Sequence, residues 1–272
     1  MRMTHGIKAA CLFITVTSLL IYAVTATGSD TPSTFDPALS TVKVNQVAPG
    51  AYTEKLSLYL LTSGNTSFSL PETAFQKVIQ QKTLGEKTGI IVSTGRNREH
   101  ADKPSGFHTR DTRLLNIDHP SVKGLSAEIK GTDTDKIISV IESRVHKIIN
   151  NKSYGIPLVS APKIIEARSG DCTEHTVLSV ALLRSLDIPA RAIVGMVLTK
   201  RFAGKRNVFV YHMWAEAYID KSWVMVDATR PGEKHPNRYI ALAFHSLETK
   251  TPLSYLEALS AIKELSVTYV KP

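Results

Sequence analysis

The residues best suited to carry chemistry include one cysteine at the expected start of a helix. Cys172 lies in the segment Ser169-Gly170-Asp171-Cys172-Thr173-Glu174-His175, and the chain has one other cysteine, Cys11. Cys11 falls in an apolar N-terminal stretch that has the features of a cleaved export signal. A mature exported protein with a single cysteine forms no internal disulfide. The Cys172 thiol therefore needs another explanation, and a reactive thiol is one.

A reactive thiol needs surroundings that stabilise its thiolate and a base that moves its proton. The N-terminus of a helix stabilises a thiolate through its free N–H groups and its dipole, and a neighbouring imidazolium adds to this effect. A cysteine nucleophile also uses a histidine base, which a carboxylate or an amide then orients. Two segments predicted as strands, 208–219 and 223–227, supply His212 and Asp227 for these roles.

The placement of His212 and Asp227 depends on the hairpin that joins their strands. If Asp220 and Lys221 form a two-residue turn, Asp227 lies opposite Trp214 and diagonal to His212, on the same face. Diagonal neighbours are about 7–8 Å apart at the backbone, within reach of side chains that lean together. A turn of another length would move this register.

Each of these residues also has a purely structural interpretation. A lone cysteine is often a small buried hydrophobe, a histidine in an apolar strand can belong to the core, and Asp227 can simply end a strand. A zinc site made of Cys172, His175 and His212 is a further hypothesis, but no spacing motif supports it.

Two residues close to the candidate triad are candidates for substrate binding. His175 follows Cys172 by about one helical turn, so it is expected to line a cleft or to serve structure. Trp214 shares the predicted face of His212, and it either lines an acyl-binding site or belongs to the core.

The elements that must position these residues follow from periodicity and capping. An apolar stripe at helical spacing predicts a helix over about 132–149, and Ser160-Ala161-Pro162 opens a short helix that runs to about residue 168. Gly170 breaks that helix, Asp171 is the expected N-cap of the next one, and Pro189 ends it. Further strands are predicted over residues 56–60, 89–93, 113–117, 190–198 and 266–270, an exposed loop over 99–112, and a last helix from Thr251.

The N-terminus has the features of an export signal. Arg2 and Lys8 precede a mostly apolar stretch over residues 9–24, and Val24-Thr25-Ala26 has the small-residue spacing of a cleavage site. We therefore expect a signal peptide over residues 1–26, with an uncleaved membrane anchor as the alternative. Both place the rest of the chain outside the cytosol, in the periplasm or secreted. No cysteine stands at the cleavage site, which argues against a lipoprotein.

The formal charge of +9 falls by two when residues 1–26 are removed, and the remaining excess is spread out. One basic cluster contains Lys200, Arg201, Lys205 and Arg206. It is interpreted as a solvated hairpin loop, or as the border of a cleft that favours acidic substrates. The chain has no nucleic-acid motif, so no nucleic-acid partner is expected.

The order and context of Cys172, His212 and Asp227 resemble the transglutaminase-like superfamily. The resemblance covers residues 131–230, through the cysteine segment, Leu186-Asp187-Ile188-Pro189-Ala190-Arg191, His212-Met213-Trp214-Ala215-Glu216 and Trp223-Val224-Met225-Val226-Asp227-Ala228-Thr229. It implies an α+β, papain-like core over 131–272, with the cysteine helix packed on an antiparallel sheet. A linker over 27–48 and a small β-rich region over 49–130 would precede this core.

The resemblance also implies a function. Cys172 would be the nucleophile, His212 the base and Asp227 the orienter of a thiol enzyme acting on protein or peptide amides, with a substrate in the cell envelope as one possibility. The products of hydrolysis, deamidation and amine transfer all remain open, and no cofactor or calcium is expected. The alternative is a non-catalytic scaffold or binding domain with the same fold. Membrane contact is expected only through an uncleaved N-terminal anchor.

Overall fold

The computed structural model describes residues 41–270 except for 46, 48, 54, 65–67, 96–101, 154–157, 233–234 and 249–264. These residues all belong to one compact unit, Phe35–Pro272. The predicted signal, residues 27–40 of the linker and the last predicted helix lie outside the described residues.

The described strands form one sheet of nine strands and a separate pair of short strands. The large sheet runs in the order β10-β7-β8-β1-β11-β2-β4-β3, and β9 pairs with β8. Its pairs are antiparallel except for β1 with β11, which are parallel. The strands are β1 Thr41–Asn45, β2 Leu56–Ser63, β3 Gln76–Leu84, β4 Lys87–Gly95, β7 Ala190–Phe202, β8 Lys205–Ile219, β9 Ser222–Val226, β10 Tyr239–His245 and β11 Ser266–Val270.

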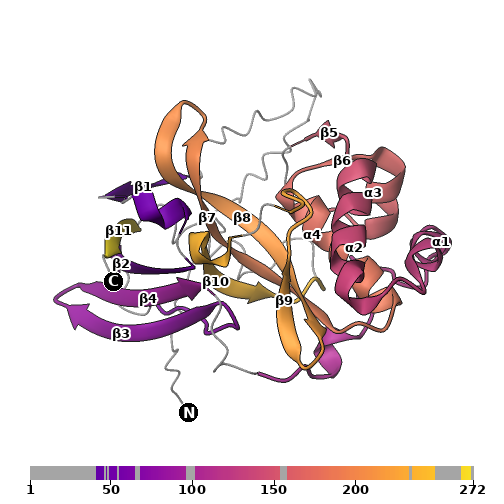
Figure 1. Ribbon diagram of the computed structural model, residues 1–272, viewed down its shortest axis with the longest axis horizontal. Helices are drawn as coiled ribbons and strands as arrows, with labels where there is room; N and C mark the ends of the chain where they lie inside the picture. Colours follow the sequence, from indigo (N-terminus) through magenta and orange to yellow (C-terminus); the bar gives the residue numbers. More distant parts are fainter. Residues whose placement is uncertain are drawn as a thin grey trace, which may run out of the picture. The chain divides into compact units, whose positions relative to one another are not determined.

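Helix α4 is the central helix of the described part. It packs against β8 and β7 and also touches the three other described helices, and every residue from Thr173 to Arg184 is buried. Figure 1 shows these helices gathered beside β7, β8 and β9, away from β2, β3 and β4. The helices are α1 Pro120–Ile129, α2 Thr134–Ile148, α3 Ala161–Ala167 and α4 Cys172–Ser185.

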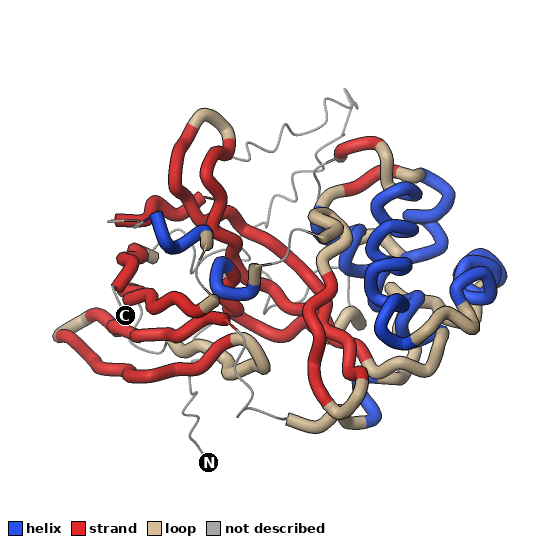
Figure 2. Tube along the Cα trace, viewed as in Figure 1, coloured by secondary structure: helices blue, strands red, loops and turns tan. Residues whose placement is uncertain are grey.

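Short elements connect these helices and strands. The strands β5 Asn151–Lys152 and β6 Ser169–Gly170 pair in parallel just before α4. The described 3-10 helices, η2 Pro49–Tyr52, η3 Gly106–His108 and η4 Pro236–Arg238, are blue like the α-helices in Figure 2, and the loops are tan. Within the described part of the chain, none of the helices has the length and apolar character of a membrane span.

The elements expected around the candidate site are confirmed. Helices α2, α3 and α4 and strands β7, β8 and β9 all occur where the sequence predicts them, as do β2, β4 and β11 farther away. The sheet, however, continues across the expected boundary at residue 130, because β1 and β11 connect β8 to β2. Strands β2, β3 and β4 are therefore part of the same sheet as β8, which carries His212, and β9, which Asp227 directly follows.

Some predictions of local structure are wrong or incomplete. Residues 113–117 form turns instead of a strand, with Asn116 at a φ of 47°. Residues 41–45, expected within a linker, form β1. Helix α1 and strands β3 and β10 were not predicted; α1 buries only Val122, Ser126 and Ile129, so its apolar stripe is weak.

Candidate functional site

Cys172 is the first residue of α4, and its position is fixed by a capping box. The Asp171 carboxylate accepts hydrogen bonds from the Thr173 N–H at 2.8 Å and from the Thr173 hydroxyl at 2.9 Å. The Glu174 carboxylate accepts the Asp171 N–H at 2.9 Å. The prediction that Asp171 caps this helix is therefore confirmed.

Strand β6, just before α4, leaves no space for a side chain at Gly170. A Cβ at Gly170 would lie 2.4 Å from the Cβ of Glu174, the residue that completes the capping box. Just upstream, Arg168 ends α3 in the left-handed conformation, with a φ of 54°. These two positions explain why the chain can leave α3 and begin α4 with the thiol at its first residue.

The hairpin of β8 and β9 has the predicted register. Asp220 and Lys221 have φ values of 50° and 62°, as a two-residue hairpin turn requires, and Ile219 pairs with Ser222. His212 and Asp227 are both buried, and His212 Nε2 lies 2.8 Å from Asp227 Oδ2. The sequence-based expectation that these side chains reach each other is confirmed.

Asp227 is held by several donors besides His212. The Tyr239 hydroxyl donates to Oδ2 at 2.8 Å, and the N–H and hydroxyl of Thr229 donate to Oδ1 at 3.1 and 2.5 Å. The Asp227 N–H in turn donates to the Glu142 carboxylate at 2.7 Å. These hydrogen bonds hold the Asp227 side chain and backbone in position.

The hydrogen bonds of Asp227 also determine its ionisation. Burial acts to raise the pKa of this carboxyl, but His212, Thr229 and Tyr239 together lower it well below its usual range. An ionised carboxylate only accepts hydrogen bonds, so His212 Nε2 is the donor. In the neutral imidazole, Nδ1 is then the nitrogen free to accept a proton.

The Cys172 side chain is partly buried beside the backbone of β8. Burial raises the pKa of the thiol well above its ordinary value, the Asp171 carboxylate adds to this, and a hydrogen bond with the backbone of Met213 opposes it. The sequence suggested that the helix N-terminus would favour the thiolate. The structure adds burial and nearby carboxylates, which favour the protonated thiol.

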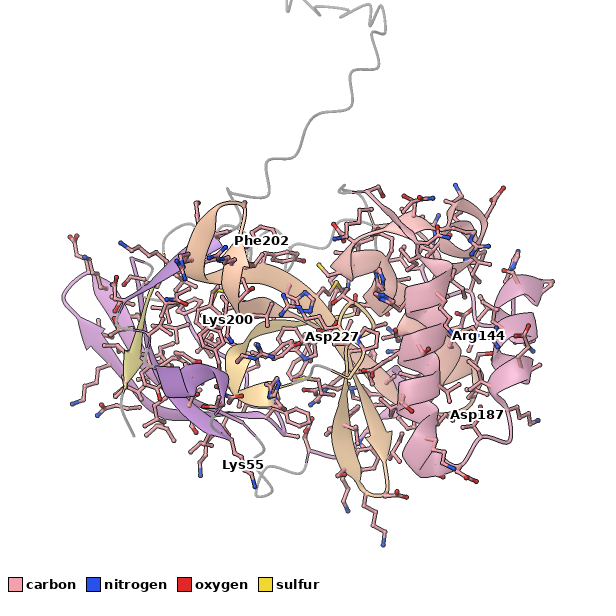
Figure 3. The ribbon with its side chains drawn as sticks, turned by 45° about the horizontal axis from the view of Figure 1, so that its top comes forward. Lys55, Arg144, Asp187, Lys200, Phe202 and Asp227 are labelled. Carbon is pink, nitrogen blue, oxygen red and sulfur yellow. The ribbon has the colours of Figure 1, made fainter. Side chains whose placement is uncertain are left out.

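Cys172 and His212 line the same cleft, which has a volume of about 520 Å³. Figure 3 labels Asp227 where the sheet approaches the helices and Phe202 near the tip of the β7–β8 hairpin. The cleft is lined by His146, Ile149, Asn150, Lys152, Gly170, Asp171, Cys172, His175, Val197, Phe202, Val210, Tyr211, His212, Thr229 and Arg230.

His175 lines this cleft one turn after Cys172. Its Nδ1 lies 2.6 Å from the Asp171 carbonyl oxygen, which only accepts, so Nδ1 is the donor. Burial lowers the pKa of this imidazole. This placement is compatible with the prediction that His175 contacts substrate, which stays a prediction.

Trp214 lies behind His212 and is absent from the lining of the cleft. Its side chain is 2% exposed, and its ring stacks on the imidazole with centroids 6.1 Å apart and an interplanar angle of 17°. A Cβ at Gly195 would come within 2.8 Å of this indole, so that glycine leaves the space that Trp214 fills. Of the two sequence interpretations of Trp214, the structure favours the core residue, and a direct contact with substrate is not supported.

Two residues that hold Asp227 were missed from the sequence. Tyr239 lies on β10, a strand that the sequence analysis did not predict. Glu142 had a usable signal, because it stands four residues after Ile138 and three before Val145 on the buried face of α2. A carboxylate at such a position indicates a specific partner inside the protein.

The basic hairpin cluster lies mostly outside the cleft. Lys200, Arg201 and Arg206 line a separate hollow with Tyr52, Thr199 and Asn207, and the Lys205 ammonium donates to the Thr41 hydroxyl at 2.8 Å. From this part of the hairpin, Phe202 lines the cleft instead. Of the two interpretations of this cluster, the hairpin loop agrees with the structure, and the border of the cleft is wrong.

The described residues contain no group of three or more histidine, cysteine, aspartate or glutamate side chains placed to hold a metal ion. The arrangement around Cys172 is that of a candidate thiol site: a cysteine at a helix N-terminus, and a histidine on β8 that is hydrogen-bonded to an aspartate just after the antiparallel neighbour β9.

The comparison with protein families agrees with the resemblance noted from the sequence. Residues 123–228 match the model of the transglutaminase-like superfamily. The match spans α2, α3, α4 and the strands that carry His212 and Asp227. A search of curated proteins finds no significant match.

Solved structures similar to this chain are distant in sequence. A protein of Cytophaga hutchinsonii proposed to be a cysteine protease has 16% identity and a TM-score of 0.47, with 79% of this chain and 83% of that chain covered. The periplasmic domain of TgpA from Pseudomonas aeruginosa has 15% identity and a TM-score of 0.44, covering 71% and 73%. Red sea bream transglutaminase has 10% identity and a TM-score of 0.35, covering 76% and 52%.

Proposed function

We propose that this protein is a thiol enzyme that cleaves or transfers the acyl group of protein or peptide amides through a thioester on Cys172. The observation that carries the proposal is the His212–Asp227 hydrogen bond beside the cleft that Cys172 also lines. The three side chains come from α4, β8 and the end of β9, which are held together by the core of the domain.

The first half of the reaction forms the thioester. The Cys172 sulfur attacks the amide carbonyl carbon while the thiol proton passes to Nδ1 of His212, and the carbonyl electron pair moves onto oxygen. We infer that the backbone N–H of Cys172, at the start of α4, stabilises this oxyanion. Collapse of the intermediate breaks the C–N bond, and His212 returns the proton to the departing amine.

The second half of the reaction consumes the thioester. His212 takes a proton from water or from an amine as that nucleophile attacks the acyl carbon, and the Cys172 thiol leaves with the proton. Water gives hydrolysis or deamidation, and an amine gives a new amide. Asp227 stays ionised throughout, because its hydrogen bonds keep its pKa low. Its role is to hold the imidazole orientation and to stabilise the imidazolium.

The protonation state of the Cys172 thiol in the free protein determines when its proton moves to His212. Because burial and Asp171 raise the pKa of Cys172, we propose that the free protein holds the thiol protonated and that proton transfer accompanies attack. This differs from a mechanism that begins with a stable thiolate–imidazolium pair.

The same raised pKa is the one observation that favours the alternative function. A scaffold or binding domain of this superfamily would keep a buried, unreactive thiol. The ordered His–Asp pair supports the enzyme instead, because a scaffold has no need to orient the imidazole in this way.

The proposed site of action is outside the cytosol. This part of the proposal rests on residues 1–26, whose sequence has the features of an export signal. Fractionation of cells followed by intact mass of the recovered protein tests it. A mass lacking residues 1–26 indicates cleavage, a full-length mass in the membrane fraction indicates an anchor, and recovery in the cytosol contradicts export.

One experiment tests the enzymatic function. The purified protein is incubated with a glutamine-containing protein and a labelled primary amine, and masses are followed for wild type, Cys172→Ala and the surface control Arg206→Gln. Addition of the amine indicates a transferase, chain cleavage a peptidase, and a gain of about one mass unit per glutamine a deamidase. Products that depend on Cys172 and persist in Arg206→Gln support the proposal, and the absence of any such product favours the scaffold.

A further inference from the structure

The cleft beside Cys172 has two unlike walls. The wall from β7 and β8 is mostly apolar, with Val197, Phe202 and Val210. The facing wall comes from the segment after α2 and from the segment after β9, and it carries Lys152 and Arg230. Cys172 lines the same cleft as both sets of residues.

Cationic side chains outnumber carboxylates among the described residues that line this cleft. Lys152 and Arg230 are cations, whereas Asp171 is the single carboxylate among the lining residues that the structure describes. The Asp171 carboxylate already accepts two hydrogen bonds from Thr173. Among the residues that the structure describes, no carboxylate forms an ion pair with Lys152 or Arg230, so within this described lining both cations are open to an anion in the cleft.

Backbone pairing connects the segments that carry both cations to the segments that carry Cys172 and Asp227. Lys152 on β5 pairs with Gly170 on β6, two residues before Cys172. The Arg230 N–H donates to the Asp227 carbonyl oxygen at 3.1 Å. The Arg230 side chain is partly buried and the Lys152 side chain is exposed. Their positions relative to the thiol are thus set by the same short segments that position Cys172 and Asp227.

We propose that Arg230 and Lys152 bind a carboxylate of the substrate, so that the enzyme selects peptide amides with an acidic side chain or a free C-terminal carboxylate close to the reacting amide. This inference rests on the proposed function of Cys172. Arg230 is suited to the main contact, because a guanidinium binds a carboxylate through two parallel hydrogen bonds. Lys152 adds a second, more mobile charge, and the apolar wall accommodates a neighbouring apolar group.

The inference can be tested without knowing the natural substrate. Iodoacetate and iodoacetamide alkylate the same sulfur and differ in that iodoacetate carries a carboxylate. The ratio of their rates at Cys172, read by mass spectrometry of the peptide that contains it, measures attraction of an anion into the cleft. The ratio also cancels changes in the fraction of thiolate, since both reagents consume the same species.

We expect the iodoacetate-to-iodoacetamide ratio to depend on the two cations, while Asp171, Asp227 and Glu174 act against an anion at the thiol. Arg230→Gln lowers it by about fivefold, the order expected for one nearby charge at the protein surface, and Lys152→Gln lowers it less. Arg230→Lys retains most of the ratio, and added salt reduces it. The matched control Arg206→Gln removes a basic residue outside the cleft and leaves the ratio unchanged.

The outcomes separate this inference from the proposed function. If Cys172 gives product with a substrate but the ratio is the same in wild type, Arg230→Gln and Lys152→Gln, anion selection is overturned and the thiol enzyme remains. If Cys172 is inert to both reagents and yields no product, both are overturned. Circular dichroism of each variant identifies unfolding, and Arg230→Lys keeps the inference testable if Arg230→Gln does not fold.

Discussion

Asp227 is the most constrained residue of the candidate site. Its two oxygens accept hydrogen bonds from His212, Thr229 and Tyr239, and its own N–H is bound to Glu142. One of these hydrogen bonds links the Asp227 carboxylate to the His212 imidazole. The others, from Thr229 and Tyr239, hold the carboxylate itself in place. Substitutions at Asp227 therefore report on orientation, and those at Tyr239 report on how firmly that orientation is held.

Asp227→Asn should nearly abolish turnover while leaving the fold intact. The amide keeps the shape of the side chain but offers an N–H in place of one acceptor oxygen, so the imidazole loses its tautomer and its charge partner. We expect kcat/KM for any Cys172-dependent reaction to fall by about 10²–10⁴-fold, the range of general acid–base catalysis. Wild-type activity in a folded Asp227→Asn variant would contradict the proposed role.

The same residue predicts how stability depends on pH. A carboxyl whose pKa is lowered on folding contributes stability above the pKa of the unfolded chain, about 3.9 for aspartate, and loses it as the pH falls toward its folded value. The free energy of unfolding should therefore decrease below about pH 4. Urea unfolding from pH 6 to pH 2 measures this, and Asp227→Asn should show a shallower decrease.

The thiol offers a third test at the scale of single residues. The Asp171 carboxylate is among the causes that raise the pKa of Cys172, so Asp171→Asn should lower this pKa and speed alkylation by iodoacetamide at neutral pH. Asparagine preserves the N-cap, so helix α4 should remain. Asp187→Asn is the control, because Asp187 lies beyond the other end of α4, about 20 Å along the helix. Equal effects of the two substitutions would contradict the electrostatic account.

At the scale of elements, the parts that carry the triad were the most predictable. The β8–β9 hairpin follows from alternation and a two-residue turn, and the start of α4 follows from Gly170 and Asp171, because these signals are local. Partners brought by distant elements were not predictable. Tyr239 reaches Asp227 from β10, and no local pattern links the two.

Trp214 shows what the alternation of side chains along a strand cannot predict. Alternation correctly places it on the same side of β8 as His212, but does not say which part of that face is covered. Tyr239 packs edge-on against the indole, with ring centroids 5.2 Å apart, and the strand that delivers Tyr239 was not predicted. Whether a residue is core or cleft depends on such covering elements.

Gly195→Ala should disturb the support behind His212. A Cβ there would lie 2.2 Å from the Ile240 carbonyl oxygen and 2.8 Å from Trp214, so β10 or the indole must move. We expect a loss of about 1–3 kcal/mol in the free energy of unfolding, typical of overpacking, together with reduced turnover. Gly204→Ala in the hairpin tip is a comparison without steric contact, although its φ of 77° adds backbone strain. If Gly195→Ala has the same stability and turnover as the wild type, the space left by Gly195 is not needed.

At the scale of the whole described unit, β1 is the strand that joins the two parts of the sheet. It pairs with β8 on one side and with β11 on the other, and Val42 and Val44 are buried in the core. Its five residues were expected in a linker, since a strand with two apolar positions resembles any short polar segment in sequence. The pairing that makes it important involves residues more than 160 positions away.

A pair of truncations tests the importance of β1. A chain that begins at residue 46 lacks the strand, and we expect it to lose cooperative thermal unfolding and to aggregate through the exposed edges of β8 and β11. A chain that begins at residue 35 retains the compact unit Phe35–Pro272 and should unfold as the longer protein does. Calorimetry and light scattering compare the two, and equal cooperativity would contradict a structural role for β1.

The parallel pairing of β1 with β11 has a consequence for synthesis. Among the described strands, the ribosome makes β1 first and Ser266–Val270 after all the others, yet β11 fills the position between β1 and β2. Until Ser266–Val270 emerges, both neighbouring strands keep an unpaired edge in the middle of the future sheet. The sheet of the nascent chain therefore stays incomplete long after Cys172 has been made.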